Sequence, residues 1–204
     1  MMREKNPESN DDDEILYQGP GYTIAKSSKA GTLVPYSSVK RPDDTNHGWI
    51  DTRNRPDLVS LIPEASGRSG LTDILTVVAQ PGSPIMSSGC ECGLFEHSLD
   101  TKLKWHAGGF VMLMYDDGDR NSDWKQLEEL ATWILSGINP TQNHITGYEI
   151  IIEPLRHFFG RTDCYALMFK PMGYGDTEEA AWLAFDFAAS AAAKSLARMP
   201  SISS

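Results

Sequence analysis

The sequence has little cysteine and no long apolar run, which argues against a disulfide-bonded secreted protein and against a membrane protein. The most apolar stretch, residues 180–193, is shorter than the ~20 apolar residues of a membrane-spanning helix and contains Asp186. Three cysteines are an odd number, and the first residues are polar and acidic, unlike a secretory signal peptide. We therefore expect a cytoplasmic protein, in a reducing compartment, with no membrane span.

Positive charge is also scarce. The chain has 18 Lys and Arg residues against 28 Asp and Glu residues, which gives a formal net charge of -10 at pH 7. Nucleic acids and anionic membranes are polyanions that would repel such a surface, so neither is an expected partner. The same charge is compatible with a basic protein partner or with a bound cation.

The composition itself is that of one globular domain. The chain has 204 residues, of which 40% are hydrophobic, and a chain of this size can bury roughly 70% of its unfolded surface without a disulfide or a metal. Residues 1–14 are acidic and almost free of apolar side chains, which predicts a disordered tail. Frequent Gly, Pro and Ser in residues 15–55 indicate an irregular segment that wraps over the core of a single domain, residues 15–204. Residues 22–25 and 32–36 are candidates for short strands within this segment.

The last stretch, residues 176–198, predicts a long Ala-rich helix around which the rest of the chain is organised. Asp176 and Glu179 suit an N-cap with an acidic residue three positions later. Because few charges follow Glu179, we expect this helix to be covered on most sides. Leu183, Phe187 and Ser190 flank its expected core stripe, which is Trp182, Phe185, Ala189, Ala192 and Leu196.

Before this helix, the spacing of apolar residues alternates between helix and strand periods. It predicts a helix over residues 69–80 and a second one from a cap at Asn121 or Ser122 to Gly137. Strands are expected over residues 85–95, 108–115, 147–153 and 163–170. The order helix-strand-strand-helix-strand-strand-helix predicts an α+β fold, with helices packed on an antiparallel sheet.

The most specific local pattern lies where the second helix is expected to begin, in the twelve residues from Asp117 to Glu128. Oxygen-bearing side chains stand at its positions 1, 3, 5, 7 and 12. This spacing is similar to that of the calcium loop of EF-hands, in which alternating acids face the ion and a final glutamate closes the shell. Ser122, however, stands where those loops have glycine, and a strand precedes the pattern. An ordinary strand-to-helix turn is the alternative interpretation. The oxygen-bearing side chains are Asp117, Asp119, Asn121, Asp123 and Glu128.

Cys90 and Cys92, together with His97 and His106, offer the side chains of a zinc site or of a thiol nucleophile with its base. His144 is a further possible base. The Cys-x-Cys spacing is shorter than that of the usual zinc knuckle, and two such cysteines share one face of a strand. Small core residues are therefore the alternative interpretation.

Residues 156–161 combine basic and aromatic side chains in a connection between two expected strands. If Phe158 and Phe159 are exposed, they would anchor a partner, with Arg156 and Arg161 beside them. If they are buried, they cap the core, as large apolar side chains usually do.

Together these features predict a protein that acts by binding another protein rather than by catalysis. Its acidity, the absence of a standard Gly-rich phosphate loop and the aromatic connection are the observations behind this hypothesis. An inhibitor, antitoxin or immunity-type protein that neutralises a basic partner would have this profile, and it would need no cofactor. A metal- or thiol-dependent hydrolase and a calcium-binding module are the alternatives. The oligomeric state is left open.

Overall fold

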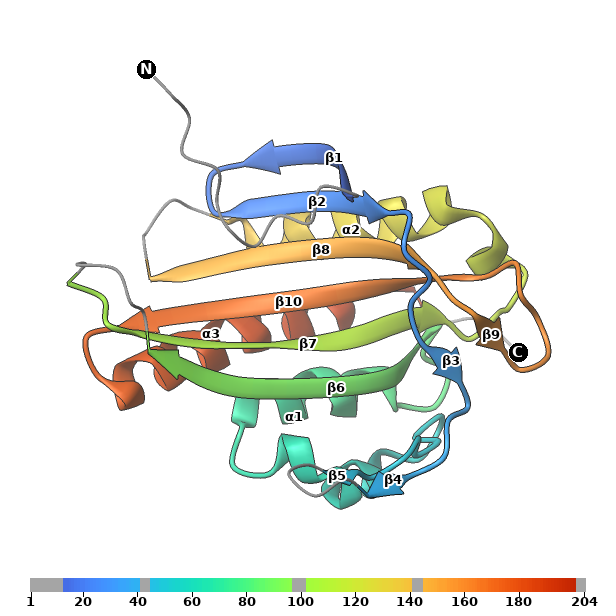
Figure 1. Ribbon diagram of the computed structural model, residues 1–204, viewed down its shortest axis with the longest axis horizontal. Coiled ribbons are helices and arrows are strands. Elements are labelled where there is room, and N and C mark those ends of the chain that lie inside the picture. The colour runs from blue at the N-terminus through green and yellow to red at the C-terminus, as the bar shows by residue number, and fades with distance from the viewer. Residues whose placement is uncertain (1–12, 41–44, 97–101, 141–144, 201–204) are drawn as a thin grey trace.

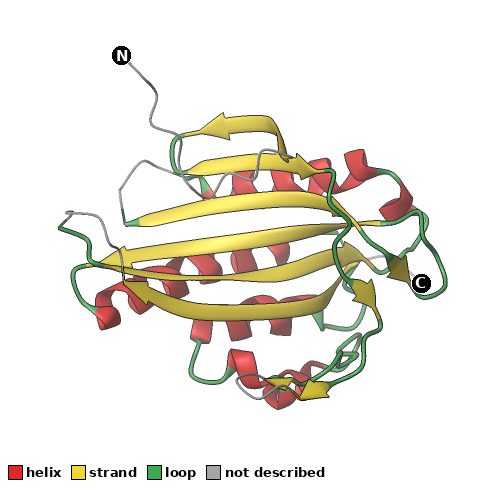
Figure 2. Cartoon of the chain, viewed as in Figure 1, coloured by secondary structure: helices red, strands yellow, loops and turns green. Residues whose placement is uncertain are grey.

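The computed structural model describes residues 13–40, 45–96, 102–140 and 145–200. A six-stranded sheet carries helices on one face, as Figures 1 and 2 show. In spatial order its strands are β1 (Asp13–Gly19), β2 (Tyr22–Ser27), β8 (Thr146–Pro154), β10 (Tyr165–Gly175), β7 (Trp105–Tyr115) and β6 (Ile85–Glu96). The α-helices of the described residues are α1 (Ser69–Val78), α2 (Trp124–Ile138) and α3 (Glu178–Leu196).

The predicted α+β class is confirmed, but the sheet is mixed rather than fully antiparallel. Each of the strand pairs β1–β2, β6–β7, β7–β10 and β8–β10 is antiparallel, whereas β2 runs parallel to β8. The chain between β2 and β8 includes the α-helices α1 and α2 and two other strands of the main sheet, β6 and β7. A connection of that length lets the chain return in either direction, whereas the short β6–β7 connection permits only an antiparallel pair.

The N-terminal segment departs from the expectation of an irregular wrap over residues 15–55. β1 and β2 form a hairpin that extends the main sheet, and β1 begins at Asp13, inside the predicted tail. Residues 1–12 of that tail lie outside the described residues. The rest of the segment does wrap: it contains β3 (Leu33–Val34), β4 (Val39–Lys40), β5 (Thr45–Asn46) and the 3-10 helices η1 (Pro56–Leu61) and η2 (Pro63–Ala65).

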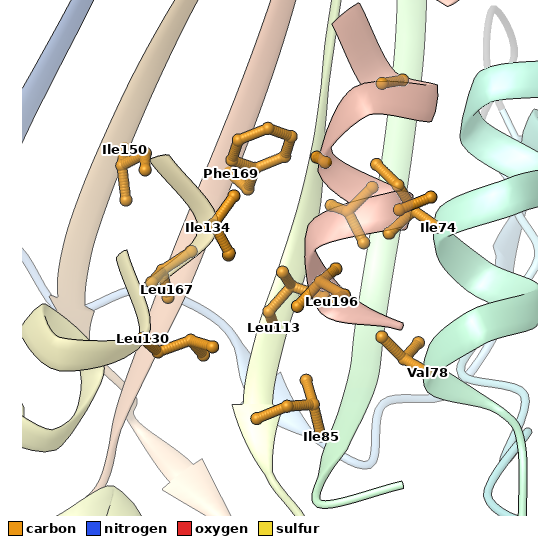
Figure 3. Packing of buried hydrophobic residues seen from close by; sticks show 14 of the residues in the cluster. Ile74, Val78, Ile85, Leu113, Leu130, Ile134, Ile150, Leu167, Phe169 and Leu196 are labelled. Atoms are coloured by element: carbon orange, nitrogen blue, oxygen red, sulfur yellow. The ribbon is translucent and has the colours of Figure 1, made fainter. Parts of the chain in front are cut away.

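The main core lies between the sheet and the three helices (Figure 3). Side chains at alternate positions of β7, β8 and β10 face the helices because successive residues of a strand point to opposite faces of the sheet. α3 packs on β7 and β10, between α1 and α2. Core side chains labelled in Figure 3 include Ile74, Val78, Leu113, Leu130, Ile134, Ile150, Leu167, Phe169 and Leu196.

A second, smaller core lies on the opposite face of the sheet. There β3 pairs with β9 (His157–Phe158) in a short parallel ladder, which lies over one end of the main sheet. The buried side chains beneath it come from β3, β6, β7, β9, β10 and the residues next to β9. They are Val34, Met86, Met112, Met114, Leu155, Phe158, Cys164 and Ala166. The sheet is therefore covered on both faces at this end.

Two glycines of β10 allow α3 to lie directly against the strand. A Cβ atom on Gly173 would overlap the backbone nitrogen of Phe185, and one on Gly175 would overlap that of Ala181. Gly70 of α1 makes a similar approach, since its Cβ would overlap the carbonyl oxygen of Asp186. The helix backbone therefore packs on places that have no side chain.

The predicted C-terminal helix is confirmed, but its cap and its outer surface differ from expectation. Thr177, rather than Asp176, caps α3 by accepting a hydrogen bond from the Ala180 amide at 3.1 Å. The sheet, α1 and α2 cover α3 on most sides, as expected, but Leu183 and Phe187 on its remaining side are 72% and 68% exposed. None of the described helices is both long and apolar enough to cross a membrane.

The second helix also begins later than the sequence indicates. Asp123 caps α2 by accepting a hydrogen bond from the Lys125 amide, whereas Asn121 and Ser122 belong to the preceding 3-10 helix η3 (Arg120–Ser122). The helix ends at Ile138, where Asn139 adopts a left-handed conformation. Asn tolerates this conformation better than most residues, so it ends the helix in place of Gly137.

We expect Gly173→Ala to destabilise the fold by about 3 kcal/mol, because the added methyl would overlap backbone atoms of α3 that cannot move independently. Chemical denaturation followed by circular dichroism would measure the change. Gly118→Ala is the matched control: its nearest contact would be Phe158 at an ordinary 3.6 Å, and its cost should stay within about 0.5 kcal/mol. Equal losses in the two variants would contradict the close-approach argument.

Candidate functional site

Three connections meet at the end of the sheet that the second core covers. They are the segment before η1, the connection from β7 to η3, and the connection between β8 and β10 (Figure 1). The strands hold these connections in place, since β7 ends and β10 begins here. Polar and aromatic side chains from all three meet there, and we call this group the loop surface. Its members are Trp49, Asp51, Arg53, Asp116, Asp119, Phe159, Arg161 and Asp163.

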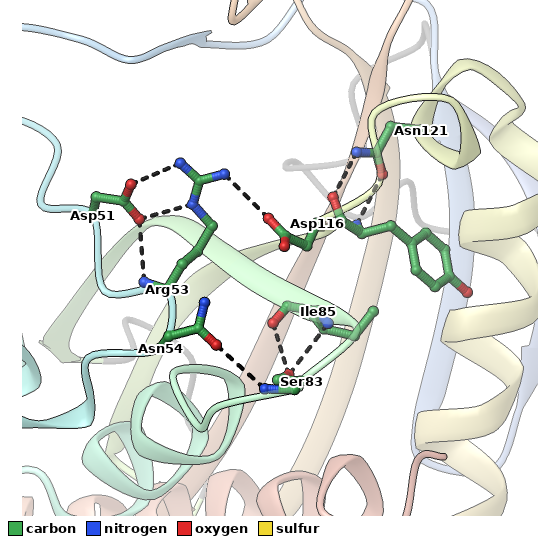
Figure 4. A network of polar contacts seen from close by, with 9 residues as sticks. Asp51, Arg53, Asn54, Ser83, Ile85, Asp116 and Asn121 are labelled. Carbon is green, nitrogen blue, oxygen red and sulfur yellow. Dashed lines mark hydrogen bonds and ion pairs between the residues drawn. The ribbon is translucent and has the colours of Figure 1, made fainter. Parts of the chain in front are cut away.

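Arg53 links two of the connections through its guanidinium group (Figure 4). Its Nε and Nη2 atoms donate to the two carboxylate oxygens of Asp51 at 2.9 and 2.7 Å, and Nη1 donates to Asp116 at 3.1 Å. The same group lies 5.0 Å from the ring centroid of Phe159 and 5.9 Å from that of Trp49. Three hydrogen bonds to carboxylates therefore fix a cation beside two aromatic rings.

Phe159 has an unusual backbone for an aromatic residue. Its φ angle is +45°, in the left-handed region, and Gly160 follows at +93°. Its amide donates to the carbonyl of Val34 at 2.9 Å, and its ring meets the Trp49 ring edge-on at 5.3 Å. A left-handed conformation is costly for a bulky residue, so the surrounding contacts must hold it. The result is an aromatic side chain that stays 43% exposed.

Arg161 links the connection between β8 and β10 to the connection between β7 and η3. It donates to Asp163 through Nε at 3.1 Å and Nη2 at 3.0 Å, and it forms an ion pair with Asp119 of the β7–η3 connection. The backbone of Arg161 also exchanges hydrogen bonds of 2.8 and 2.9 Å with Phe158. The turn that carries Phe159 is thus closed by main-chain bonds and tied to its neighbour by charge.

Each of the two arginines lowers the pKa of one carboxyl group that it contacts. Hydrogen bonds from Arg53 lower the pKa of Asp51, and those from Arg161 lower the pKa of Asp163. A lowered carboxyl pKa means that the pair contributes to stability above the unfolded-state pKa and loses this contribution as pH falls through the folded-state value. The ion pairs are therefore intact at neutral pH. Because the groups are largely exposed, each contributes little to stability.

The loop surface is chemically suited to recognition. Trp and Arg are the residues that most often dominate the energy of protein interfaces, and aromatic side chains in general are enriched there. Its four carboxylates outnumber its two guanidinium groups, so the surface keeps a negative charge. Two side chains of other chemistry adjoin it: His157, whose Nε2 accepts from the Gly160 amide at 3.0 Å, and Cys164, whose pKa is raised by burial.

No family model, curated protein or solved structure matches this chain. Its function has to follow from the geometry of its own residues.

Of the four residues predicted to bind a partner, the structure separates Phe158 from the others. Phe158 is 4% exposed and belongs to the second core, whereas Phe159 and Arg161 lie on the loop surface. Arg156 is exposed, and its amide donates to the carbonyl of Thr32 at 3.1 Å. Each of the two alternatives therefore applies to one ring, because these neighbouring residues face opposite ways.

Sequence reasoning missed Trp49 and Arg53. Both lie in a stretch rich in turn-forming residues, where no periodicity marks a functional side chain. The sequence does carry a weak signal, since Asp51 and Arg53 are spaced so that their side chains can pair within one turn. What the sequence does not show is that this turn lies against Phe159, more than a hundred residues later in the chain.

The residues of the calcium-loop pattern do not converge. Among the described residues, no group of three or more His, Cys, Asp or Glu side chains is placed to hold a metal ion. Each of the five has its own partner instead. Asp117 accepts from the Asp119 amide, Asp119 pairs with Arg161, Asn121 bonds Tyr115, Asp123 caps α2, and Glu128 accepts a hydrogen bond from Tyr17. This arrangement corresponds to the alternative interpretation, a strand-to-helix turn.

Cys90 and Cys92 lie on the opposite face of the sheet from His106. Cys90 pairs with Val111 in the β6–β7 register, on the helix-covered face. His106 pairs with Phe95 and lies on the other face, where its ring stacks on that of Tyr174 at 4.7 Å. The sheet therefore separates these thiols from this imidazole. His97 and His144 lie outside the described residues.

Both thiols are also held in their protonated form. Burial is the largest cause of the raised pKa of Cys90, about 12, and Glu64 adds to it. Burial likewise raises the pKa of Cys92, whose sulfur lies 3.4 Å from the carbonyl oxygen of Glu64. A thiol nucleophile reacts as the thiolate, so these two side chains act as small core residues.

We expect the folded protein to react slowly with thiol reagents. A pKa of about 12 leaves Cys90 with roughly a thousandfold less thiolate than a free cysteine at the same pH. Reaction with a chromogenic disulfide at about pH 8 should be slow in buffer and fast in denaturant, which serves as the control. Rapid labelling of Cys90 or Cys92 in the folded protein, located by mass spectrometry, would contradict the assignment.

We expect Asn121→Ala to destabilise the protein by about 2–4 kcal/mol. The fully buried Asn121 side chain accepts from the Tyr115 amide at 2.9 Å and donates to the Tyr115 carbonyl at 2.8 Å (Figure 4). Alanine would leave both main-chain groups buried and unsatisfied. Urea denaturation would measure the loss. The exposed neighbour Ser122→Ala is the control and should cost less than about 0.5 kcal/mol; similar losses would refute this role.

Proposed function

We propose that this chain is a non-enzymatic protein that binds another protein through the loop surface. The observation that carries the proposal is the conformation of Phe159, a partly exposed aromatic residue held in left-handed backbone geometry against Trp49 and Arg53. Strained residues persist where the surroundings over-determine them, and such places are often functional. Nothing in the core requires this ring to be at the surface, since Phe158 already fills the second core.

Pre-organisation is what makes such a ring useful for binding. Association costs conformational entropy for each interface side chain that becomes immobilised when the partner binds. Phe159 is already fixed by its backbone, and Arg53 is already fixed by Asp51 and Asp116. The anchor residues therefore lose little further freedom when a partner covers them, so more of the contact energy remains as affinity.

Charge supports a basic partner. The chain carries a net charge of -10, and the carboxylates of the loop surface exceed its guanidinium groups. Complementary charge accelerates the encounter of two proteins and disfavours partners of the same sign. An inhibitor, antitoxin or immunity-type protein that neutralises a basic target fits this combination of an acidic surface and a rigid aromatic anchor. On the described residues, no observation favours the hydrolase or the calcium-binding module.

The test is a comparative capture of the natural partner. The wild-type chain and its Phe159→Ala variant would be used as bait in extracts of the source cells, with Phe95→Ala as the matched control. Phe95 is also an exposed phenylalanine, but it lies on β6 beside His106, away from the loop surface. We expect one basic protein to be retained by wild type and by Phe95→Ala, and lost with Phe159→Ala.

Affinity measured with the purified partner would then give the size of the effect. Phe159→Ala should raise the dissociation constant at least about thirtyfold, the loss expected for a central aromatic anchor. Binding should also weaken as salt is added, because part of the attraction is long-range. An unchanged affinity for Phe159→Ala, or an acidic partner, would refute the proposal. Thermal unfolding of each variant would show that the fold is retained.

A further inference from the structure

The outer face of α3 carries apolar side chains that no described element covers. Leu183 and Phe187, one helical turn apart, are among the most exposed large hydrophobic residues of the described chain, and Ala191 continues the line by one more turn. The inner face of the same helix is buried against the sheet. A helix surrounded by α1, α2 and the sheet therefore still presents an apolar stripe to its surroundings.

A shallow hollow lies directly beside this stripe. It occupies about 280 Å³ and runs along the junction of α2 and α3. Small residues form much of its lining, and Phe187 also lines it. The residues that line it are Gly137, Phe187, Ser190, Ala191, Lys194 and Arg198. The face thus offers both a protruding ring and a place to receive a side chain.

Charge is arranged symmetrically about Phe187. Glu179 lies eight residues before it and Lys194 seven residues after it, and both are exposed. With a rise of 1.5 Å per residue, they stand about 12 Å and about 10.5 Å from Phe187 along the helix. The acidic start and basic end also suit the dipole of a single helix. The additional feature here is that an apolar stripe, centred on Phe187, lies between two opposite charges at nearly equal distances.

We propose that a second copy of this chain covers the face, with the two α3 helices antiparallel and a two-fold axis passing near Phe187. A two-fold contact requires one surface to complement itself. In this arrangement Glu179 of each copy meets Lys194 of the other, and the ring of Phe187 meets its own counterpart. Leu183 of each copy lies opposite Ala191 of the other, where it enters the hollow.

The contact extends beyond α3. A specific interface buries about 800 Å² on each partner, which is more than the outer face of one helix supplies. Trp133 of α2 is exposed and donates from its indole nitrogen to the carbonyl of Ser195 at 3.2 Å, so it lies alongside the end of α3. It adds a large aromatic surface next to the hollow, in the position from which an antiparallel neighbour would be contacted.

Dimerisation in this manner leaves the loop surface free. β10 begins at the loop surface and runs away from it, and α3 returns, so the C-terminal end of α3 is nearest to the loop surface (Figure 1). An antiparallel pair of helices therefore places the two loop surfaces at opposite ends of the dimer. If the proposed function holds, each dimer binds two partners that do not touch one another.

Sedimentation and light scattering of the purified full chain would test the dimer, over roughly 1 µM to 1 mM protein. We expect wild type to dimerise within this range and Phe187→Ser to raise the dissociation constant at least about tenfold. Leu61→Ser is the matched control, since Leu61 is a similarly exposed apolar residue on η1. It should dimerise as wild type does. Wild-type protein that stays monomeric throughout the range would overturn the proposal.

An exchange of charges tests the orientation of the pair. Glu179→Lys alone and Lys194→Glu alone each place like charges together twice, so each variant should dimerise at least about tenfold more weakly than wild type. An equimolar mixture of the two should recover dimers, because the introduced lysine of one variant then meets the introduced glutamate of the other. Glu178→Lys makes the same charge change in the same turn but points elsewhere, and serves as the control.

Two results would overturn the antiparallel arrangement: dimers in both single variants as stable as wild type, or a mixture no better than its components. Failure here is distinguishable from failure of the proposed function, because Phe159→Ala should leave the dimer intact. Conversely, Phe187→Ser should leave each loop surface able to bind its partner. Circular dichroism of each variant would confirm that the fold is retained, as expected for side chains that are mostly solvent-exposed.

Discussion

The structure depends on the direct contact between the backbone of α3 and the backbone of β10. Gly173 and Gly175 leave no side chain between them, and the alanines of α3 complete the fit. Close packing of this kind has few alternative arrangements, since a single methyl group already overlaps backbone atoms. It fixes the helix on the sheet, and through α3 it positions α1 and α2 on either side. The same contact fixes which face of α3 is left outside.

The two faces of the sheet explain why potential catalytic groups do not meet. Cys90 and Cys92 face the helices, and His106 faces the other way, although all three lie on adjacent strands. Alternation along a strand separates residues that sequence spacing alone would group together. Burial then keeps the thiols protonated, as expected for apolar surroundings.

At the loop surface, by contrast, residues that are distant in sequence are brought together, because three connections converge at the ends of neighbouring strands. The sheet thus holds loops without regular secondary structure in a fixed arrangement, which is a common basis for binding sites.

Much of the fold could be predicted because its signals are local. The helices α1, α2 and α3 and the strands β6, β7, β8 and β10 follow from apolar spacing. β7, which is apolar on both faces, lies inside the sheet between β10 and the edge strand β6. Residues 22–25 were correctly identified as a candidate strand and lie within β2, but β1 and its pairing with β2 were missed. β1 is the edge strand and exposes many of its side chains, so it lacks the strong period of a core strand. Helix caps were wrong by one or two residues, since several neighbouring Asp, Asn, Ser and Thr residues can each fill that role.

The sequence by itself determined the α+β class, the order of the main elements and the acidic character of the surface, because periodicity and charge are properties of neighbouring residues. It also marked residues 156–161 as a possible contact, but it did not separate Phe158 from Phe159. Only the tertiary structure decided that one ring enters the core while the other joins Trp49 and Arg53, and that Leu183 and Phe187 remain outside. The reason is physical: exposure depends on which distant segment covers a residue, and a local pattern does not carry that information.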